Sequence, residues 1–244
     1  MEAGTEAAFA LAVSALLALV AISTARAGLV LQRYIPERNI LLGLPDNALR
    51  ILAVIACFVI GVTLGPGPQA LGWSTEHILR NFAVGALFGF AMSLCIGLGA
   101  RVAVALWGPQ VVSTRIVRCI LPMDRGEWVG VLAAMLPAAL LEELLFRSLP
   151  LGGLGWLVSP WVLPWPLSLL FGLMHWPQGG WGVAGATFVG VLLSFLFLGS
   201  GSLWAALAAH YVLNVHQLVT AHRAGLAPLR AQRPATPEAP VTLP

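Results

Sequence analysis

The sequence is poor in charge and contains no lysine. Only 9% of its 244 residues are charged and 59% are hydrophobic, whereas about 25% of the residues in a typical soluble domain are charged. A soluble fold of this length could not hide so much apolar surface in one core, so the composition favours a lipid bilayer as the solvent. All 13 basic residues are arginine, and the net charge is +3. The arginines are scattered through the connections, which argues against a nucleic-acid partner.

Cysteine is also scarce. Cys57 and Cys95 lie in apolar stretches, and Cys119 lies in a connection. An odd, dispersed set of this kind has the spacing of neither a disulfide framework nor a zinc site. We expect all three to be buried packing residues.

Hydropathy predicts an all-α fold, a polytopic transmembrane helical bundle of about seven spans, within a range of six to eight, that forms one domain over residues 1–222. The first stretch lacks the positively charged start of a signal peptide, so we expect it to be a retained span. Residues 223–244 contain Pro and Arg without periodicity and are expected to be a disordered tail. The spans are predicted near residues 7–31, 48–65, 82–107, 128–149, 165–176, 183–200 and 202–221.

Most of the scattered arginines lie in the first and third connections and in the tail. With seven spans and an outside N-terminus, all three segments face the cytoplasm, which agrees with the positive-inside rule. We therefore expect a multi-pass protein of a bacterial inner membrane, with a cytoplasmic C-terminus and the lipid bilayer as one partner.

Two adjacent carboxylates, Glu142 and Glu143, lie well inside an apolar run. One charged residue at mid-bilayer costs about 2.5–3.5 kcal/mol on insertion scales, so such residues are functional candidates. Glu143 and Arg147 are four residues apart and can pair on one helical face. Glu142 points about 100° away and is expected to keep a free carboxylate. The alternative is that both glutamates belong to a structural network around Arg147.

His175 and His210 also lie among apolar residues. His210 and Asn214 are four apart and share a helical face, and Phe171 is placed to pack beside His175. His216 is expected to point away from that face and to be structural. His175 reaches the depth of Glu142 only if its helix begins near Trp165, which leaves 148–164 as an outer or re-entrant segment around a polar cavity.

These residues suit hydrolysis inside the membrane. Glu142 with His175 can activate water, and His210 with Asn214 can hold the oxyanion. Zinc is the rival interpretation, since two His and one Glu form a common catalytic ligand set. Because His-Glu-x-x-His is absent and Asn214 is a poor zinc ligand, we expect neither a metal nor another cofactor.

Three ordered motifs resemble those of the CAAX protease and bacteriocin-processing (CPBP, or Abi) family. They are Glu142-Glu143-x-x-x-Arg147, Phe171-x-x-x-His175 and His210-x-x-x-Asn214. The resemblance covers roughly residues 127–221 and implies a glutamic-type intramembrane endopeptidase, a type historically described as a metalloprotease. It implies that Glu142, His175, His210 and Asn214 are catalytic and that Glu143 and Arg147 support them.

The expected function is cleavage of a membrane-associated protein or peptide, as in C-terminal processing of a prenylated or sorting-signal-bearing protein. Two alternatives remain open besides a zinc-dependent peptidase. A non-catalytic immunity protein would keep the fold and act by binding. A proton-coupled transporter could also use buried Glu and His, although the inverted repeats typical of transporters are absent from the sequence.

Overall fold

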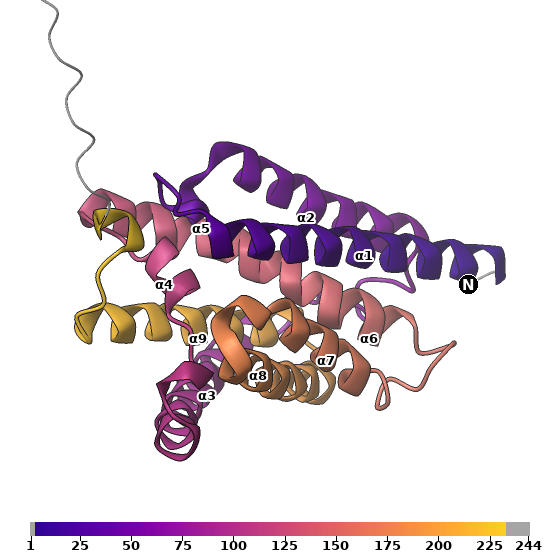
Figure 1. Ribbon diagram of the computed structural model, residues 1–244. Helices are drawn as coiled ribbons and strands as arrows, with labels where there is room; N and C mark the ends of the chain where they lie inside the picture. Colours follow the sequence, from indigo (N-terminus) through magenta and orange to yellow (C-terminus); the bar gives the residue numbers. More distant parts are fainter. Residues whose placement is uncertain (1–2, 233–244) are drawn as a thin grey trace, which may run out of the picture.

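The computed structural model describes residues 3–232, and these residues form helices and connections without any strand (Figure 1). The all-α prediction is therefore confirmed. In chain order the elements are α1 (Ala3–Arg33), η1 (Ile40–Leu42), α2 (Leu44–Leu64), α3 (Ile78–Trp107), η2 (Pro109–Val111), α4 (Arg115–Ile120), α5 (Arg125–Glu143), η3 (Leu144–Ser148), α6 (Leu149–Gly153), α7 (Pro164–Met174), η4 (Trp176–Gln178), α8 (Gly179–Ser200), α9 (Leu203–Arg223) and η5 (Leu229–Gln232).

Each of the seven predicted spans corresponds to a helix, but the seven helices are not alike. Five helical stretches are long and apolar enough to cross a membrane: α1, α2, α3, Arg125–Gly153 and Trp176–Ser200. Helix α7 is apolar but has only 11 residues. Helix α9 has 21 residues, but its histidines and amides lower its hydropathy, because this is the helix that carries much of the polar site.

Two of the three apolar clusters among the described residues flank the polar residues of interest, and the third, around Val131 and Leu218, lies near the α4 end. Helices α1 and α2 lie side by side along α5 and α6 (Figure 1), and the larger cluster fills the space between them around Phe9, Cys57 and Leu144. The second cluster joins α3, α8 and α9 through Met92 and Leu193. The polar residues of interest lie between these two halves.

Helices α3 and α9 approach each other very closely. A Cβ on Gly85 would overlap the carbonyl oxygen of Ala205, and a Cβ on Gly89 would overlap that of Ala209. These contacts advance together along both helices, so α3 and α9 run in the same direction, as the seven-span topology predicts. Small residues spaced four apart are a common device for bringing transmembrane helices together.

The arginine-rich connections gather at one end of the bundle around α4. Arg115 donates to the carbonyl of Leu31 at 2.5 Å, and Arg118 donates to that of Ala227 at 2.9 Å. Arg230 forms an ion pair with Glu127 at the start of α5. Three chain segments that were predicted to share the cytoplasmic side therefore lie together.

The segment after α9 begins as an ordered stretch. Residues 224–232, which were predicted to belong to the tail, include the buried Leu229 and the ion-paired Arg230. An apolar side chain and a paired cation give this stretch contacts that its Pro and Arg content does not reveal. The rest of the predicted tail, 233–244, lies outside the described residues.

All three cysteines are free thiols. Cys57 and Cys119 are buried, as expected, but Cys95 is exposed, so the prediction of burial was wrong for that residue. Cys95 follows the buried Ser93 by two positions and therefore lies about 200° around α3 from it.

Candidate active site

The two glutamates lie where an α-helix changes into a π-helical turn. Helix α5 is capped by Asp124, whose side chain accepts from the backbone of Glu127, and ends at Glu143. The next five residues, η3, are π-helical and lead directly into α6. Single π-turns inside helices occur frequently at functional sites. The sequence predicted a continuous α-helix here, without this turn.

Glu143 is the centre of the buried network. Its Oε1 accepts a hydrogen bond from Arg147 Nη1 at 2.8 Å and lies 2.6 Å from His210 Nδ1. Glu143 and Arg147 are both fully buried. The expected Glu143–Arg147 pair is therefore present, and the contact with His210 adds a second function: a carboxylate at this nitrogen requires Nδ1 to carry the proton and donate.

Phe171 on α7 packs against several members of the network at once. Its ring centroid lies 4.6 Å from that of His175 and 5.9 Å from that of His210. The Arg147 guanidinium carbon stands 4.8 Å from the same centroid. The predicted packing of Phe171 beside His175 is confirmed, and the ring also covers a buried cation, which is a favourable cation–π arrangement.

His175 lies directly after the last residue of α7, a helix that begins at Pro164, close to the predicted start near Trp165. Its Nδ1 lies 2.7 Å from the carbonyl oxygen of Phe171. Because a carbonyl can only accept, Nδ1 must hold the proton in this contact, and neutral His175 presents the lone pair of Nε2. The chain then breaks at η4 and Gly179, as the Pro and Gly residues predicted.

His210 and Asn214 lie on α9, and the nearest ionic contact of Glu142 is with His210. The distance from Glu142 Oε2 to His210 Nε2 is 3.5 Å, and the Glu142 side chain is 32% exposed while that of His210 is 4% exposed. His210 therefore stands between the two carboxylates. Within residues 3–232 no hydrogen bond joins Glu142 to His175, the pair predicted to activate water.

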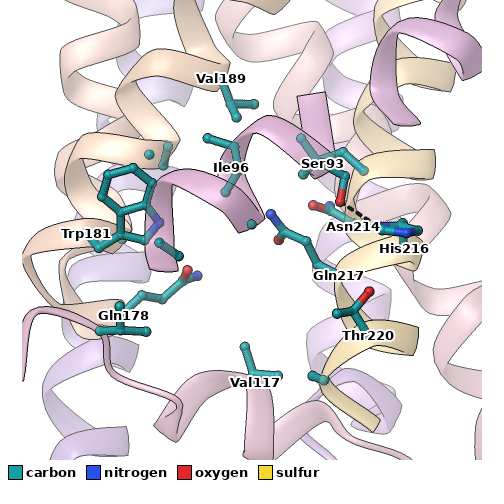
Figure 2. A pocket seen from close by; sticks show the side chains of 18 of the residues that line it. Ser93, Ile96, Val117, Gln178, Trp181, Val189, Asn214, His216, Gln217 and Thr220 are labelled. Atoms are coloured by element: carbon teal, nitrogen blue, oxygen red, sulfur yellow. Dashed lines mark hydrogen bonds between the residues drawn. The ribbon is translucent and has the colours of Figure 1, made fainter. Parts of the chain in front are cut away.

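A cavity of about 600 Å³ opens beside these residues. His175, His210 and Asn214 all line it, together with Phe171, whereas Glu142 borders it through His210. The cavity is bounded by α3, α8 and α9 and by the connections near α4 (Figure 2). Among its described lining residues there is no acidic side chain, and Arg101 is the one permanent cation.

One polar contact of the cavity comes from a part of the chain that carries no motif. Ser93 on α3 is buried, and its Oγ lies 2.7 Å from His216 Nδ1 (Figure 2). The ring of Phe90 stands edge-on to the same imidazole. His216 was expected to point away from the site, yet it lines the same cavity as Asn214 because α3 forms the adjoining wall. The signal that the sequence offered was Gly85, Gly89 and Ser93 at four-residue spacing, a small-residue face.

The hydroxyl of Ser148 is held by two hydrogen bonds to the loop after α2. It donates to the carbonyl of Leu71 at 2.8 Å and accepts from Trp73 Nε1 at 2.8 Å. Both contacts hold the loop after α2 against η3, so this serine is occupied in packing the connection and has no base beside it.

The described donors do not form a metal-binding cluster. Residues 3–232 contain no group of three or more His, Cys, Asp or Glu side chains that could hold a metal ion. Glu143 Oε1 is already bound by Arg147 Nη1 and His210 Nδ1, so this oxygen is not free to bind a metal. The residues present therefore fit a zinc centre poorly.

Comparison with known families identifies the segment that holds this network. Residues 124–216 match the family described as type II CAAX prenyl endopeptidase, Rce1-like. The match includes all three motifs and ends at His216. In the comparisons with curated proteins and with solved structures, nothing matches the chain.

Proposed function

We propose, because residues 124–216 belong to the Rce1-like CAAX prenyl endopeptidase family, that this membrane protein hydrolyses a peptide bond of a membrane-associated protein. The observation that carries the proposal is the cavity of about 600 Å³ on which His175, His210 and Asn214 converge. Its walls are formed largely by hydrophobic helices, and its polar groups are few and convergent, which is typical of a substrate site.

In the proposed mechanism His175 and Glu142 activate water. The contact with Phe171 leaves the Nε2 of His175 as a free base, and Glu142 is the less buried of the two carboxylates. The water oxygen attacks the scissile carbonyl carbon while its proton passes to this pair. The same proton is then delivered to the leaving amine nitrogen as the C–N bond breaks.

His210 and Asn214 are proposed to stabilise the oxyanion. Asn214 lines the cavity and carries an amide N–H₂ donor, and in the proposal a protonated His210 offers Nε2–H while Nδ1–H stays on Glu143. With His210 protonated, two carboxylates face two cations, because Arg147 supplies the other positive charge. Glu143 and Arg147 are therefore positioning residues that orient His210.

The proposed substrate is a protein with a lipidated or otherwise membrane-bound C-terminal segment. Apolar walls suit a hydrophobic substrate segment, and Arg101 is the cation that an anionic C-terminus could meet in the lining. We further propose a bacterial inner-membrane location with a cytoplasmic C-terminus, since the arginine-rich connections gather at the α4 end.

The test uses the full chain in liposomes with a farnesylated peptide ending in a CAAX sequence, and separation of products by mass. We expect Glu142→Gln and His175→Ala each to lower kcat by about 100-fold or more, the range of general acid–base catalysis. Glu76→Gln and His77→Ala alter the same residue types in the exposed connection before α3 and serve as controls.

Full activity of either site variant would contradict the mechanism. A failure of the wild-type protein to cleave any lipidated peptide, together with protection of cells from a toxin by Glu142→Gln, would favour a binding protein instead.

A further inference from the structure

Three amide side chains in the cavity have no hydrogen-bond partner among residues 3–232. Asn214 and Gln217 lie on α9 and Gln178 lies in η4, and all three line the cavity. None of their side-chain atoms makes a hydrogen bond with another described residue, although Gln178 uses its backbone to bind His175 and Ser113. Asn214 has a proposed function in catalysis, but the two glutamines do not.

The glutamines face each other across the cavity. Figure 2 shows Gln178 and Gln217 pointing into the same space from opposite walls, with Ile96 of α3 above both in the view. Gln217 follows Asn214 by three positions on α9, which places both on one helical face. Gln178 follows His175 by three positions around a 3₁₀ turn, where such side chains eclipse. Each glutamine therefore stands beside a proposed catalytic residue.

The chemistry of these groups matches a peptide backbone. A primary amide carries two donor hydrogens and an acceptor oxygen, so it can pair with both the N–H and the C=O of a peptide unit. An extended peptide presents such groups alternately on its two edges. The cavity also has apolar walls, including Val189 and Leu213. Gln178 is half-buried and Gln217 is exposed in this space, so both amides are accessible to a bound peptide.

We propose that Gln178 and Gln217 bind the main chain of an extended peptide substrate from opposite walls and hold the scissile bond beside His175 and Asn214. The proposal rests on the proposed peptidase function and assigns binding residues to it. Because the contacts are with the backbone, they recognise an extended peptide as such and leave the choice of side chains to the apolar walls.

The first measurement compares KM and kcat of Gln178→Leu, Gln217→Leu and the wild type with the farnesylated CAAX peptide in liposomes. Loss of one hydrogen bond of ordinary strength should raise KM roughly 3- to 10-fold and change kcat less. Gln217→Met serves as a second variant if Leu perturbs folding. Gln110→Leu is the matched control, since the side-chain amide of Gln110, in η2, is already bound to the carbonyl of Trp107 at the end of α3.

The second measurement removes the hydrogen bond from the substrate side. In a series of peptides, each non-scissile amide is replaced in turn by an ester, which deletes one N–H. At least one ester should raise KM roughly 3- to 10-fold for the wild type. The same ester should raise KM no further in the matching Gln→Leu variant, because the effects of removing the two partners of one hydrogen bond are not additive.

The proposal would be overturned if every ester raised KM equally in the wild type and in both Gln→Leu variants. It would also be overturned if the Gln→Leu substitutions left KM unchanged. A fall in kcat at constant KM would overturn it as well, because the glutamine amides would then act on the catalytic water and not on the binding of the substrate. If the wild-type protein cleaved no peptide in the series, the proposed function itself would fail, a result distinct from cleavage without glutamine dependence.

Discussion

Replacing Arg147 by methionine tests the buried network directly. Methionine is similar in length and apolar, so Arg147→Met removes the charge while leaving little empty space. The substitution deletes the 2.8 Å hydrogen bond to Glu143, the 3.3 Å hydrogen bond to the carbonyl of Gly190, and the cation over the Phe171 ring. What remains is a fully buried carboxylate whose one remaining partner is His210.

Breaking a buried ion pair by removing one partner costs about 3–5 kcal/mol, because the other charge stays buried without compensation. In a chain of this size each kcal/mol shifts the melting temperature by about 2–4 °C, so Arg147→Met should melt about 6–20 °C below the wild type. The double variant Glu143→Gln with Arg147→Met removes both charges and should recover roughly half of that loss.

The assay is thermal unfolding of the purified protein in detergent micelles, followed by intrinsic fluorescence of the nine tryptophans. The wild type, the single variants Glu143→Gln and Arg147→Met, and the double variant together form a complete cycle. A free energy of unfolding of Arg147→Met within about 1 kcal/mol of the wild-type value would refute the cost assigned to the unpaired carboxylate. A double variant no more stable than Arg147→Met would refute it as well.

Three further outcomes are expected. Zinc chelators such as 1,10-phenanthroline should leave the cleavage rate unchanged within about twofold, because the described donors fit a metal centre poorly; a rate restored only by added Zn²⁺ would contradict this. Gly89→Ala should separate α3 from α9 and lower stability by about 1–3 kcal/mol, whereas Gly199→Ala, on an open surface of α8, should be neutral or slightly stabilising; equal effects in the two would refute the close approach. A phosphatase fused after the last residue should be inactive and a fluorescent protein at the same place bright, because we expect the C-terminus in the cytoplasm; the reverse pattern would invert the topology.

Local periodicity predicted much of the fold. The apolar runs gave helices close to their expected limits, and four-residue spacing correctly paired Glu143 with Arg147 and Phe171 with His175. Each contact joins residues four positions apart along the chain, so it depends on local geometry and not on where the helix lies in the bundle. The break after His175 was predictable for a related reason, since Pro177 and Gly179 disfavour continued helix.

Contacts between distant segments were not predictable in this way. His210 meets Glu143 across 67 positions and His216 meets Ser93 across 123, and neither separation leaves a periodic trace. The π-helical turn after Glu143 changes which side chains share a face of the helix. The regular α-helical period of 3.6 residues therefore could not predict that Glu143 Oε1 would contact both Arg147 and His210.

The cavity has walls of two different origins. The motif residues come from the segment that matches the peptidase family, whereas Ser93, Ile96 and Val117 come from α3 and α4, which precede it. Substitutions at the cavity-facing positions Ile96 and Val117 can change which substrates fit, provided that Gly85 and Gly89 keep α3 against α9. These positions are therefore where a new substrate preference could evolve without rebuilding the chemistry, and their substitution should alter selectivity rather than rate.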